Sequence, residues 1–301
     1  MKSTAPAGLA PFEVLFDHSE FNPALTPELR DFAGNVGFPP APAARPWVFA
    51  NFVQSIDGMV SLGGAQPGGE WIAHSRHDRW MMDLLRAHAD AIISGARSLE
   101  LEARFGRIPG GPVYRIVDPA LLDYRHQTLG RRKLINIIVT GSGQLRVSDY
   151  RLFRSEHVES WIATTPEGQR QLSGAGDTRV LVSGSGREID WADLAGQLRS
   201  LGVAHLLCEG GPALYGSMLR ARLIDEKFLT ISPQEIGSEH PANAPLSAGV
   251  ESYPPRLTSF TGPGFSAETA QWFRLLSCRR AGEHVFLRYR AVPTPASVAS
   301  E

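Results

Sequence analysis

Cysteine is scarce in this sequence, which contains only Cys208 and Cys278 among its 301 residues. Two cysteines are too few for a disulfide framework, and no zinc-ligand spacing is visible among them and the nine histidines. The pattern therefore predicts two buried thiols in a reducing compartment and no metal site.

Long apolar runs and an excess of one charge are also missing. No run approaches the roughly 18 apolar residues of a membrane-spanning helix, and the first residues lack a signal-peptide pattern. Lysine and arginine number 30 against 31 aspartates and glutamates, so the formal net charge is −1. Nucleic-acid-binding surfaces need clustered or excess basic residues. We therefore expect a cytoplasmic protein that binds a small molecule rather than a membrane or a nucleic acid.

Several nucleotide-binding and catalytic signatures do not occur. No G-x-G-x-x-G follows the first predicted strand, and there is no G-x-x-x-x-G-K-[ST] phosphate loop. A G-x-S-x-G nucleophile elbow and the H-x-E with P-C-x-x-C pattern of zinc deaminases are absent too. These absences argue against Rossmann-type dehydrogenases, P-loop enzymes, serine hydrolases and zinc deaminases.

The sequence does contain alternating strand and helix patterns. Runs of apolar, aromatic and β-branched residues predict strands at residues 47–53, 91–94, 134–140, 159–165, 179–183, 206–208 and 228–232. One-sided apolar stripes and caps predict helices at 75–88, 190–201 and 212–222. Because several strands are apolar throughout, we expect an α/β fold with a mostly parallel central sheet flanked by helices. Residues 273–278 and 284–290 predict a C-terminal antiparallel hairpin.

The first 44 residues differ from the rest in being rich in proline and alanine. A short helix is predicted there at 26–32, with Thr26 as N-cap and Pro27 at the first helical position. We expect residues 1–44 to form an N-terminal extension and residues 45–301 to form one domain. For the segment 233–252 a lid, a dimer contact and a simple surface loop all remain open.

Ligands bind beyond the carboxyl ends of parallel strands, so the residues after each strand are candidates for a site. Asp57-Gly58, residues 95–98 and the Gly-Ser-Gly triplets at 141–143 and 184–186 follow predicted strands. Taken alone, each of these stretches is at least as typical of a turn or a helix cap as of a ligand site. Together with the stretch that follows residue 208, they indicate a phosphate-bearing ligand that lies across the sheet edge.

That stretch is Glu209-Gly210-Gly211-Pro212, and it follows a fully apolar strand. Two glycines let the main chain approach a ligand closely, and Pro212 suits the first turn of a helix. The free backbone amides from Ala213 onward would face outward at the positive end of the helix dipole. The stretch therefore predicts an anion site suited to a pyrophosphate.

Five segments, in this order, resemble the reductase domain of bacterial riboflavin biosynthesis, a family with a dihydrofolate reductase-like fold. They are RPWVFANFVQSIDG (45–58), GGEWIAHS (68–75), LLRAHADAIISGARSLELE (84–102), LINIIVTGSGQL (134–145) and LLCEGGPALYGSMLRARLIDEKFLTISP (206–233). The resemblance covers about residues 45–290. It implies an NADPH-dependent reductase of a C=N or C=O bond in a heterocyclic or ribosyl-phosphate substrate, similar to 5-amino-6-(5-phosphoribosylamino)uracil reductase. It also implies a homodimer, and we expect a stand-alone domain without the deaminase half.

The resemblance also implies particular site residues. Its cofactor contacts fall on Val53, Trp71, Ser98, Glu102, Gly141, Gly211, Pro212, Ala213, Leu214, Tyr215, Gly216 and Ser217. Its substrate contacts fall on Gly69, Arg86 and Glu209, and its catalytic carboxylates on Asp57 and Glu209. In this hypothesis Arg86 clamps a substrate phosphate, while Glu209 and Asp57 fix polar groups of a ring or relay a proton.

The sequence departs from the family pattern on the substrate side. Ser98 stands where the family usually has threonine, and Gly69 stands where it often has serine. The family's Asp-Asp-Pro and following arginine are replaced by residues 102–107, Glu-Ala-Arg-Phe-Gly-Arg. The sequence therefore leaves two alternatives open, a dihydrofolate reductase-type activity on a pterin and a nucleotide-binding protein without catalysis.

Overall fold

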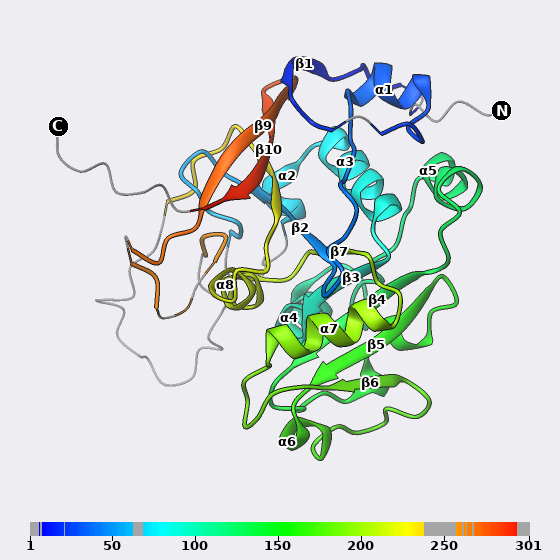
Figure 1. Ribbon diagram of the computed structural model, residues 1–301, viewed down its shortest axis with the longest axis vertical. Coiled ribbons are helices and arrows are strands. Elements are labelled where there is room, and N and C mark those ends of the chain that lie inside the picture. The colour runs from blue at the N-terminus through cyan, green and yellow to red at the C-terminus, as the bar shows by residue number, and fades with distance from the viewer. Residues whose placement is uncertain are drawn as a thin grey trace.

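The structure is a computed structural model that describes residues 6, 8–20, 22–62, 69–237, 257–260, 262, 264–266 and 268–293. Within this part of the chain, a ten-stranded sheet has the order β1-β9-β10-β8-β2-β7-β3-β4-β5-β6. Figure 1 shows β1, β9 and β10 at one end of the molecule and β4 to β6 at the other. The segment 233–252 lies outside the described residues from position 238 onward, so its three alternatives stay untested.

Seven neighbouring strands of the sheet run parallel. They are β2 (Trp47–Gln54), β3 (Ala91–Gly95), β4 (Leu134–Thr140), β5 (Val158–Thr164), β6 (Arg179–Val182), β7 (His205–Cys208) and β8 (Glu226–Ile231). Strand β7 lies between β2 and β3, with Cys208 level with Ala50 on one side and with Ile93 on the other. The prediction of a mostly parallel α/β sheet is confirmed, because apolar runs suit strands that are covered on both faces.

The rest of the sheet is antiparallel. Strands β9 (Trp272–Ala281) and β10 (His284–Val292) form the predicted C-terminal hairpin, and β10 also pairs with β8. The sequence analysis missed β1 (Glu13–Asp17), which pairs with β9 at the sheet edge. Its pattern is weak because Val14 and Leu15 are exposed, at 40% and 54% of their surface.

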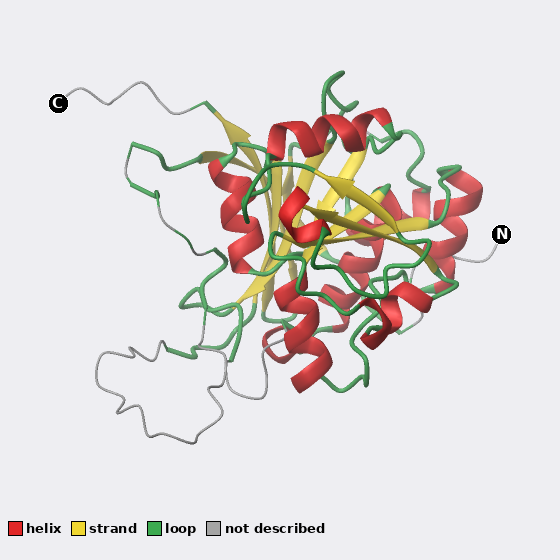
Figure 2. Ribbon diagram, turned by 90° about the horizontal axis from the view of Figure 1, so that it is seen from below, coloured by secondary structure: helices red, strands yellow, loops and turns green. Residues whose placement is uncertain are grey.

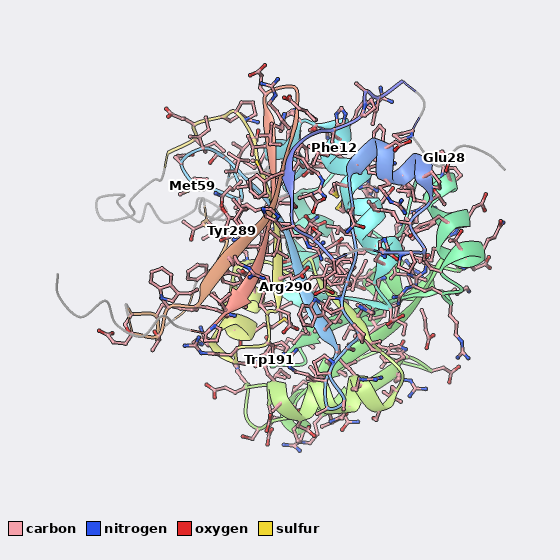
Figure 3. The ribbon with its side chains drawn as sticks, turned by 45° about the horizontal axis from the view of Figure 1, so that its top comes forward. Phe12, Glu28, Met59, Trp191, Tyr289 and Arg290 are labelled. Carbon is pink, nitrogen blue, oxygen red and sulfur yellow. The ribbon has the colours of Figure 1, made fainter. Side chains whose placement is uncertain are left out.

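The N-terminal segment packs onto the sheet. Helix α1 (Pro27–Ala33) begins with Thr26 as N-cap, whose side chain accepts a hydrogen bond from the Leu29 amide, as predicted. Phe12, labelled in Figure 3, and Phe32 are buried. Phe12 packs edge-on against Phe286 of β10. The described part of residues 1–44 therefore shares the core of the rest of the chain, while the domain boundary at residue 45 stays a prediction.

Helices cover both faces of the sheet (Figure 2). The longer ones are α3 (Arg76–His88), α4 (Ala96–Phe105), α7 (Trp191–Ser200) and α8 (Pro212–Arg220). The shorter ones are α2 (Glu70–Ala73), α5 (Pro119–Asp123), α6 (Pro166–Gln169), the π-helix η1 (Tyr124–Thr128) and the 3₁₀ helices η2 (Val147–Asp149) and η3 (Arg151–Arg154).

The two faces of the sheet form two apolar cores. One face packs with α1, α3, α4 and α5 around residues such as Phe49, and the other packs with α7 and α8 around Val48 and Ala50. Adjacent residues of β2 thus serve opposite faces, as the alternation of a strand requires. This two-sided cover leaves the carboxyl edge of the parallel strands as the place where a cavity opens.

Candidate functional site

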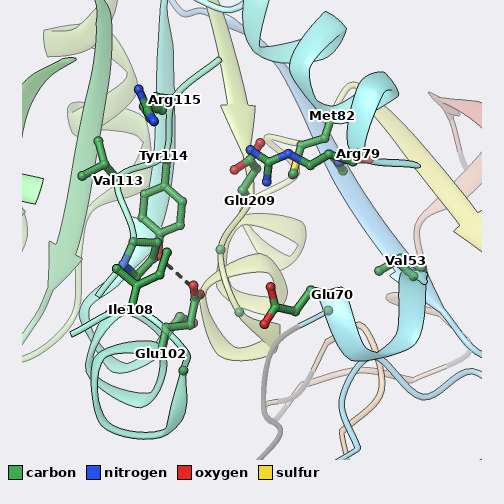
Figure 4. A pocket seen from close by; sticks show the side chains of 18 of the residues that line it. Val53, Glu70, Arg79, Met82, Glu102, Ile108, Val113, Tyr114, Arg115 and Glu209 are labelled. Atoms are coloured by element: carbon green, nitrogen blue, oxygen red, sulfur yellow. Dashed lines mark hydrogen bonds between the residues drawn. The ribbon is translucent and has the colours of Figure 1, made fainter. Parts of the chain in front are cut away.

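A cavity of about 1170 Å³ lies at the carboxyl edge of the parallel strands. Its wall includes Val53 at the end of β2, Ser98 just after β3, and residues 209–212 just after β7. These three strands are neighbours in the sheet, so their ends meet at one place. The cavity also takes in Gly69, Trp71, Arg86 and Glu102, so most of the residues predicted from the sequence are brought together. Figure 4 shows three of the predicted residues, Val53, Glu102 and Glu209, around the cavity.

Arg86 and Glu209 form a buried ion pair in the cavity wall. The Arg86 Nε atom donates to Glu209 Oε1 at 2.8 Å, and Nη2 donates to Oε2 at 2.7 Å. Nη1 donates to the carbonyl oxygen of Arg115 at 2.6 Å. Burial lowers the pKa of Arg86, but the charges of Glu209 and Asp83 and the hydrogen bond to Glu209 together raise it above its usual value, so the guanidinium stays charged. Three of the five guanidinium N–H donors thus bind protein acceptors, and Arg86 as a clamp for a substrate phosphate stays a prediction.

Glu102 is a half-buried carboxyl group that faces Glu70 across the cavity in Figure 4. The hydroxyl of Tyr114, itself buried, donates to Glu102 Oε1 at 3.4 Å. Burial, together with the charge of Glu209, raises the pKa of Glu102 to about 7. Among the predicted residues Glu102 is therefore a carboxyl group that can hold and release a proton near neutral pH.

The start of helix α8 forms another part of the wall. Gly211 is its N-cap residue, which gives no side-chain cap, and Pro212 is at the first turn, as predicted. A Cβ atom at Gly211 would clash with the Ser98 hydroxyl, so the first turn of α4 and the loop after β7 are in close contact. The first amides of α8 have no side-chain cap, which is the local arrangement that suits an anion.

Later residues of α8 turn away from the cavity wall. Leu214 and Tyr215 are buried in the core, and Tyr215 packs against the ring of Phe52 with centroids 4.7 Å apart. The Ser217 hydroxyl accepts a hydrogen bond from the Trp191 indole at 2.7 Å. Ala213 and Gly216 do not line the cavity either. Direct cavity contacts from this predicted stretch are thus limited to Gly211 and Pro212, because a helix presents successive residues to different sides.

Two further predicted residues lie outside the cavity wall. Asp57 is exposed and accepts hydrogen bonds from the Ser55 hydroxyl and from the amides of Ile236 and Gly237. The Ser55 hydrogen bond, with those amides, lowers the pKa of Asp57. Gly141 packs so closely on the loop after β6 that a Cβ atom would clash with the Arg187 carbonyl. Asp57 is thus hydrogen-bonded to the backbone of a neighbouring loop, and Gly141 is packed against the backbone of another.

Sequence reasoning missed several residues of the wall. Tyr114 belongs to a loop without a periodic pattern, so only the fold places it beside Glu102. Arg107 lies with its guanidinium carbon 4.2 Å from the ring centroid of Trp71, in a cation–π contact between two sides of the cavity. The one available signal for Arg107 was its place in residues 102–107, which stand where the family has Asp-Asp-Pro and a following arginine.

The remaining expectations concern cysteines, metals and membranes. Cys208 and Cys278 are both free and buried, and burial raises the pKa of Cys208 to about 12. The described ranges hold no group of three or more His, Cys, Asp or Glu residues arranged for a metal ion. Nor does any helix in the described ranges have the length and apolar character to cross a membrane.

The fold and the cavity define an α/β protein with the dihydrofolate reductase-like architecture of the riboflavin-pathway reductases, which confirms the predicted fold. The bifunctional deaminase and 5-amino-6-(5-phosphoribosylamino)uracil reductase of Thermotoga maritima superposes with a TM-score of 0.58 at 16% identity, over 82% of this chain and 57% of that one. A pyrimidine reductase-like protein of Corynebacterium diphtheriae superposes with a TM-score of 0.57 at 22% identity, over 83% and 93%.

The sequence model of the RibD C-terminal domain family matches residues 46–260, and the chain belongs to this family. The riboflavin biosynthesis protein RibD of Escherichia coli K12 is 26% identical over 204 residues, which are 64% of this chain and 50% of that protein. RibD of Aquifex aeolicus is 23% identical over 201 residues. The chain spans about half the length of the curated relatives it matches.

Proposed function

We propose that this protein is an NADPH-dependent reductase of a C=N or C=O bond in a heterocyclic, sugar-phosphate-bearing substrate. The proposed reaction is similar to that of 5-amino-6-(5-phosphoribosylamino)uracil reductase, the activity named for the T. maritima relative. The observation that carries the proposal is that the start of α8, which has no side-chain cap, and the Arg86–Glu209 pair line the same cavity. An anion site and a fixed polar group within one cavity suit a nucleotide cofactor beside a polar ring.

The start of α8 fits the diphosphate of a nicotinamide cofactor. Gly211 contributes no side chain, so the main chain can approach a phosphate, and the positive end of the helix dipole favours the negative charge. The Ser98 hydroxyl lies beside Gly211 and offers a further hydrogen bond. The bound cofactor would supply the hydride, while the protein positions the substrate and limits the access of water.

Glu209 would orient the substrate. Arg86 holds both carboxylate oxygens by hydrogen bonds of 2.7–2.8 Å, so the carboxylate is fixed in direction. Each carboxylate oxygen can accept more than one hydrogen bond, so Glu209 retains capacity for N–H or O–H groups of a ring. We assign substrate orientation to this residue, because both of its oxygens accept hydrogen bonds from the Arg86 guanidinium.

The proton that accompanies hydride transfer would come from Glu102. Its pKa of about 7 leaves a substantial protonated fraction at neutral pH, and Tyr114 holds the carboxyl group in place. For Asp57 we propose a structural role instead, since it binds the backbone of residues 236 and 237. A homodimer and a cytoplasmic location are supported by the family resemblance alone, and light scattering would test the first.

Two measurements test the proposed function. Titration with NADPH and with NADH, followed by quenching of tryptophan fluorescence, measures cofactor binding and preference. Loss of NADPH absorbance is then followed with 5-amino-6-(5-phosphoribosylamino)uracil and, in a separate assay, with dihydrofolate. Oxidation with the pyrimidine supports the proposal, whereas oxidation with dihydrofolate alone would replace it. Binding without oxidation of either compound would favour a nucleotide-binding protein without this catalysis.

A further inference from the structure

The loop between α4 and α5 forms one side of the cavity without regular secondary structure. Residues 111–118 belong to neither a helix nor a strand, and Tyr114, Arg115 and Val117 line the cavity. In the described part of the chain, the backbone of residues 112–117 makes no hydrogen bond to another backbone group. Because backbone groups that are shielded from water need partners, side chains from other elements have to hold this loop.

Three buried side chains on α3 and β4 supply those partners. Asp83 Oδ2 accepts hydrogen bonds from the amides of residues 117 and 118, both at 2.9 Å. Arg86 Nη1 donates to the carbonyl oxygen of residue 115 at 2.6 Å. Asn136 Nδ2 donates to the carbonyl oxygen of Tyr114 at 2.9 Å. The position of the loop is therefore set by side chains that lie beneath it.

Asn136 is a polar residue inside an apolar strand. It is fully buried in β4, on the face that carries Leu134 and Ile138, and both of these residues belong to the apolar core. Within the residues that the structure describes, its Oδ1 atom has no hydrogen-bond partner. A buried amide with an unpaired oxygen costs stability, which an apolar side chain at this position would avoid. What the amide gains in return is the hydrogen bond to the Tyr114 carbonyl.

Tyr114 links this loop to Glu102. Its hydroxyl donates to Glu102 Oε1 at 3.4 Å, the bond that Figure 4 draws as a dashed line. Burial raises the pKa of Glu102, while the hydrogen bond from Tyr114 lowers it. The other charged groups that act on Glu102 are Glu209 after β7, Arg86 on α3 and Glu70 on α2. A displaced Tyr114 would therefore change both the direction of the carboxyl group and its pKa.

We propose that Asn136 is a positioning residue, which holds Tyr114 against Glu102 and thereby fixes the carboxyl group of the proton donor. Asn136 does not line the cavity. It acts through two hydrogen bonds in series, from its own amide to the Tyr114 carbonyl and from the Tyr114 hydroxyl to Glu102. This inference rests on the proposed function for the role of Glu102.

The test compares Asn136→Leu with Tyr114→Phe, with the double variant and with Ile138→Val, a control on the same strand and face. We expect the leucine variant to move the midpoint of the pH dependence of kcat upward by roughly half a pH unit, because the bond that lowers the pKa of Glu102 is weakened. Tyr114→Phe should move it in the same direction. The double variant should move it no further than Tyr114→Phe does, since both changes break one chain of bonds. The control should lower stability and leave the midpoint unchanged.

A direct titration of Glu102 separates this inference from the proposed function. Glutamate labelled with carbon-13 at the carboxyl carbon reports the protonation of Glu102 by NMR, and Glu102→Gln identifies the signal. An unshifted Glu102 titration in Asn136→Leu would overturn the inference, even where the enzyme is active. A protein without reductase activity whose Glu102 titration still shifts would overturn the proposed function and leave the inference standing. If the leucine variant does not fold, Asn136→Ala removes the same bond without added bulk and is judged by the same titration.

Discussion

Arg86 and Glu209 are joined by two parallel hydrogen bonds, Nε to Oε1 at 2.8 Å and Nη2 to Oε2 at 2.7 Å. The pair links the last turn of α3 to the end of β7 and lies in the cavity wall. Their side chains are 5% and 8% exposed, so little water screens the interaction. The pair therefore serves both the stability of the fold and the shape of the site.

Substitution Glu209→Gln should separate these two roles. The amide keeps the size of the side chain but removes the charge, which leaves the buried Arg86 with the more distant Asp83, at 3.7 Å, as its counter-ion. We expect a loss of about 2–4 kcal/mol in the free energy of unfolding and a fall in kcat by roughly tenfold or more. NADPH affinity should stay native, because the cofactor end at Gly211 is untouched. Urea unfolding measures the change in stability, and steady-state kinetics measure the change in kcat. Native turnover in this variant would show that Glu209 is purely structural.

A second ion cluster provides the control. Glu226 is fully buried and accepts bonds from Arg288 at 2.6 and 2.9 Å and from Arg290 (Figure 3) at 2.8 and 2.9 Å. It does not line the cavity. Glu226→Gln should cost about 3–5 kcal/mol of unfolding free energy but leave kcat of the folded protein unchanged. A fall in kcat at low temperature, where the variant is folded, would contradict this separation.

Gly211 tests the anion site. Gly211→Asp places a carboxylate at the start of α8, where we propose that the diphosphate binds, and like charges repel. NADPH affinity should fall by about a hundredfold or more. Gly211→Ala is the steric control, since its Cβ meets only the Ser98 hydroxyl, a side chain that can rotate, and Gly211 has an ordinary φ of −66°. Equal NADPH affinity in the aspartate variant and the native protein would refute the diphosphate assignment.

Glu102 should make the rate depend on pH. If Glu102 donates the proton, kcat falls as the pH rises through its pKa of about 7. Glu102→Gln should remove this step and lower kcat at pH 6. A Tyr114→Phe variant, which keeps the carboxyl group but loses its hydrogen bond, should shift the step and not abolish it. A step near pH 7 that persists in the glutamine variant would assign it to another group.

Glu102 should also make the free energy of unfolding fall as the pH rises. The folded pKa of Glu102 lies above its ordinary value of 4.5, so the folded state binds more protons between about pH 4.5 and 7. The contribution of this group to stability is therefore greatest at low pH and declines as the pH rises through that interval. Relative to the native protein, Glu102→Gln should gain stability at pH 8 and none at pH 4, as measured by urea unfolding.

The sequence alone determined most of the fold. Continuous apolar runs can only be buried between two layers, so they predicted the parallel strands, and the cap at Thr26 marked the start of α1. The sequence could not predict β1, whose apolar side chains are largely exposed and whose partner β9 lies more than 250 residues later. Nor could it show that each guanidinium nitrogen of Arg86 donates to a protein acceptor.

Which strand ends share the cavity was decided by tertiary structure. Strand β7 comes late in the chain but inserts between β2 and β3, and this order sets Glu209 and Gly211 beside Val53 and Ser98. The loop after β4 has similar glycines, yet it packs against the loop after β6. Local sequence reports the conformation a loop can adopt. The neighbours of that loop follow from pairings between residues far apart in the chain, and these depend on burial of the whole sheet.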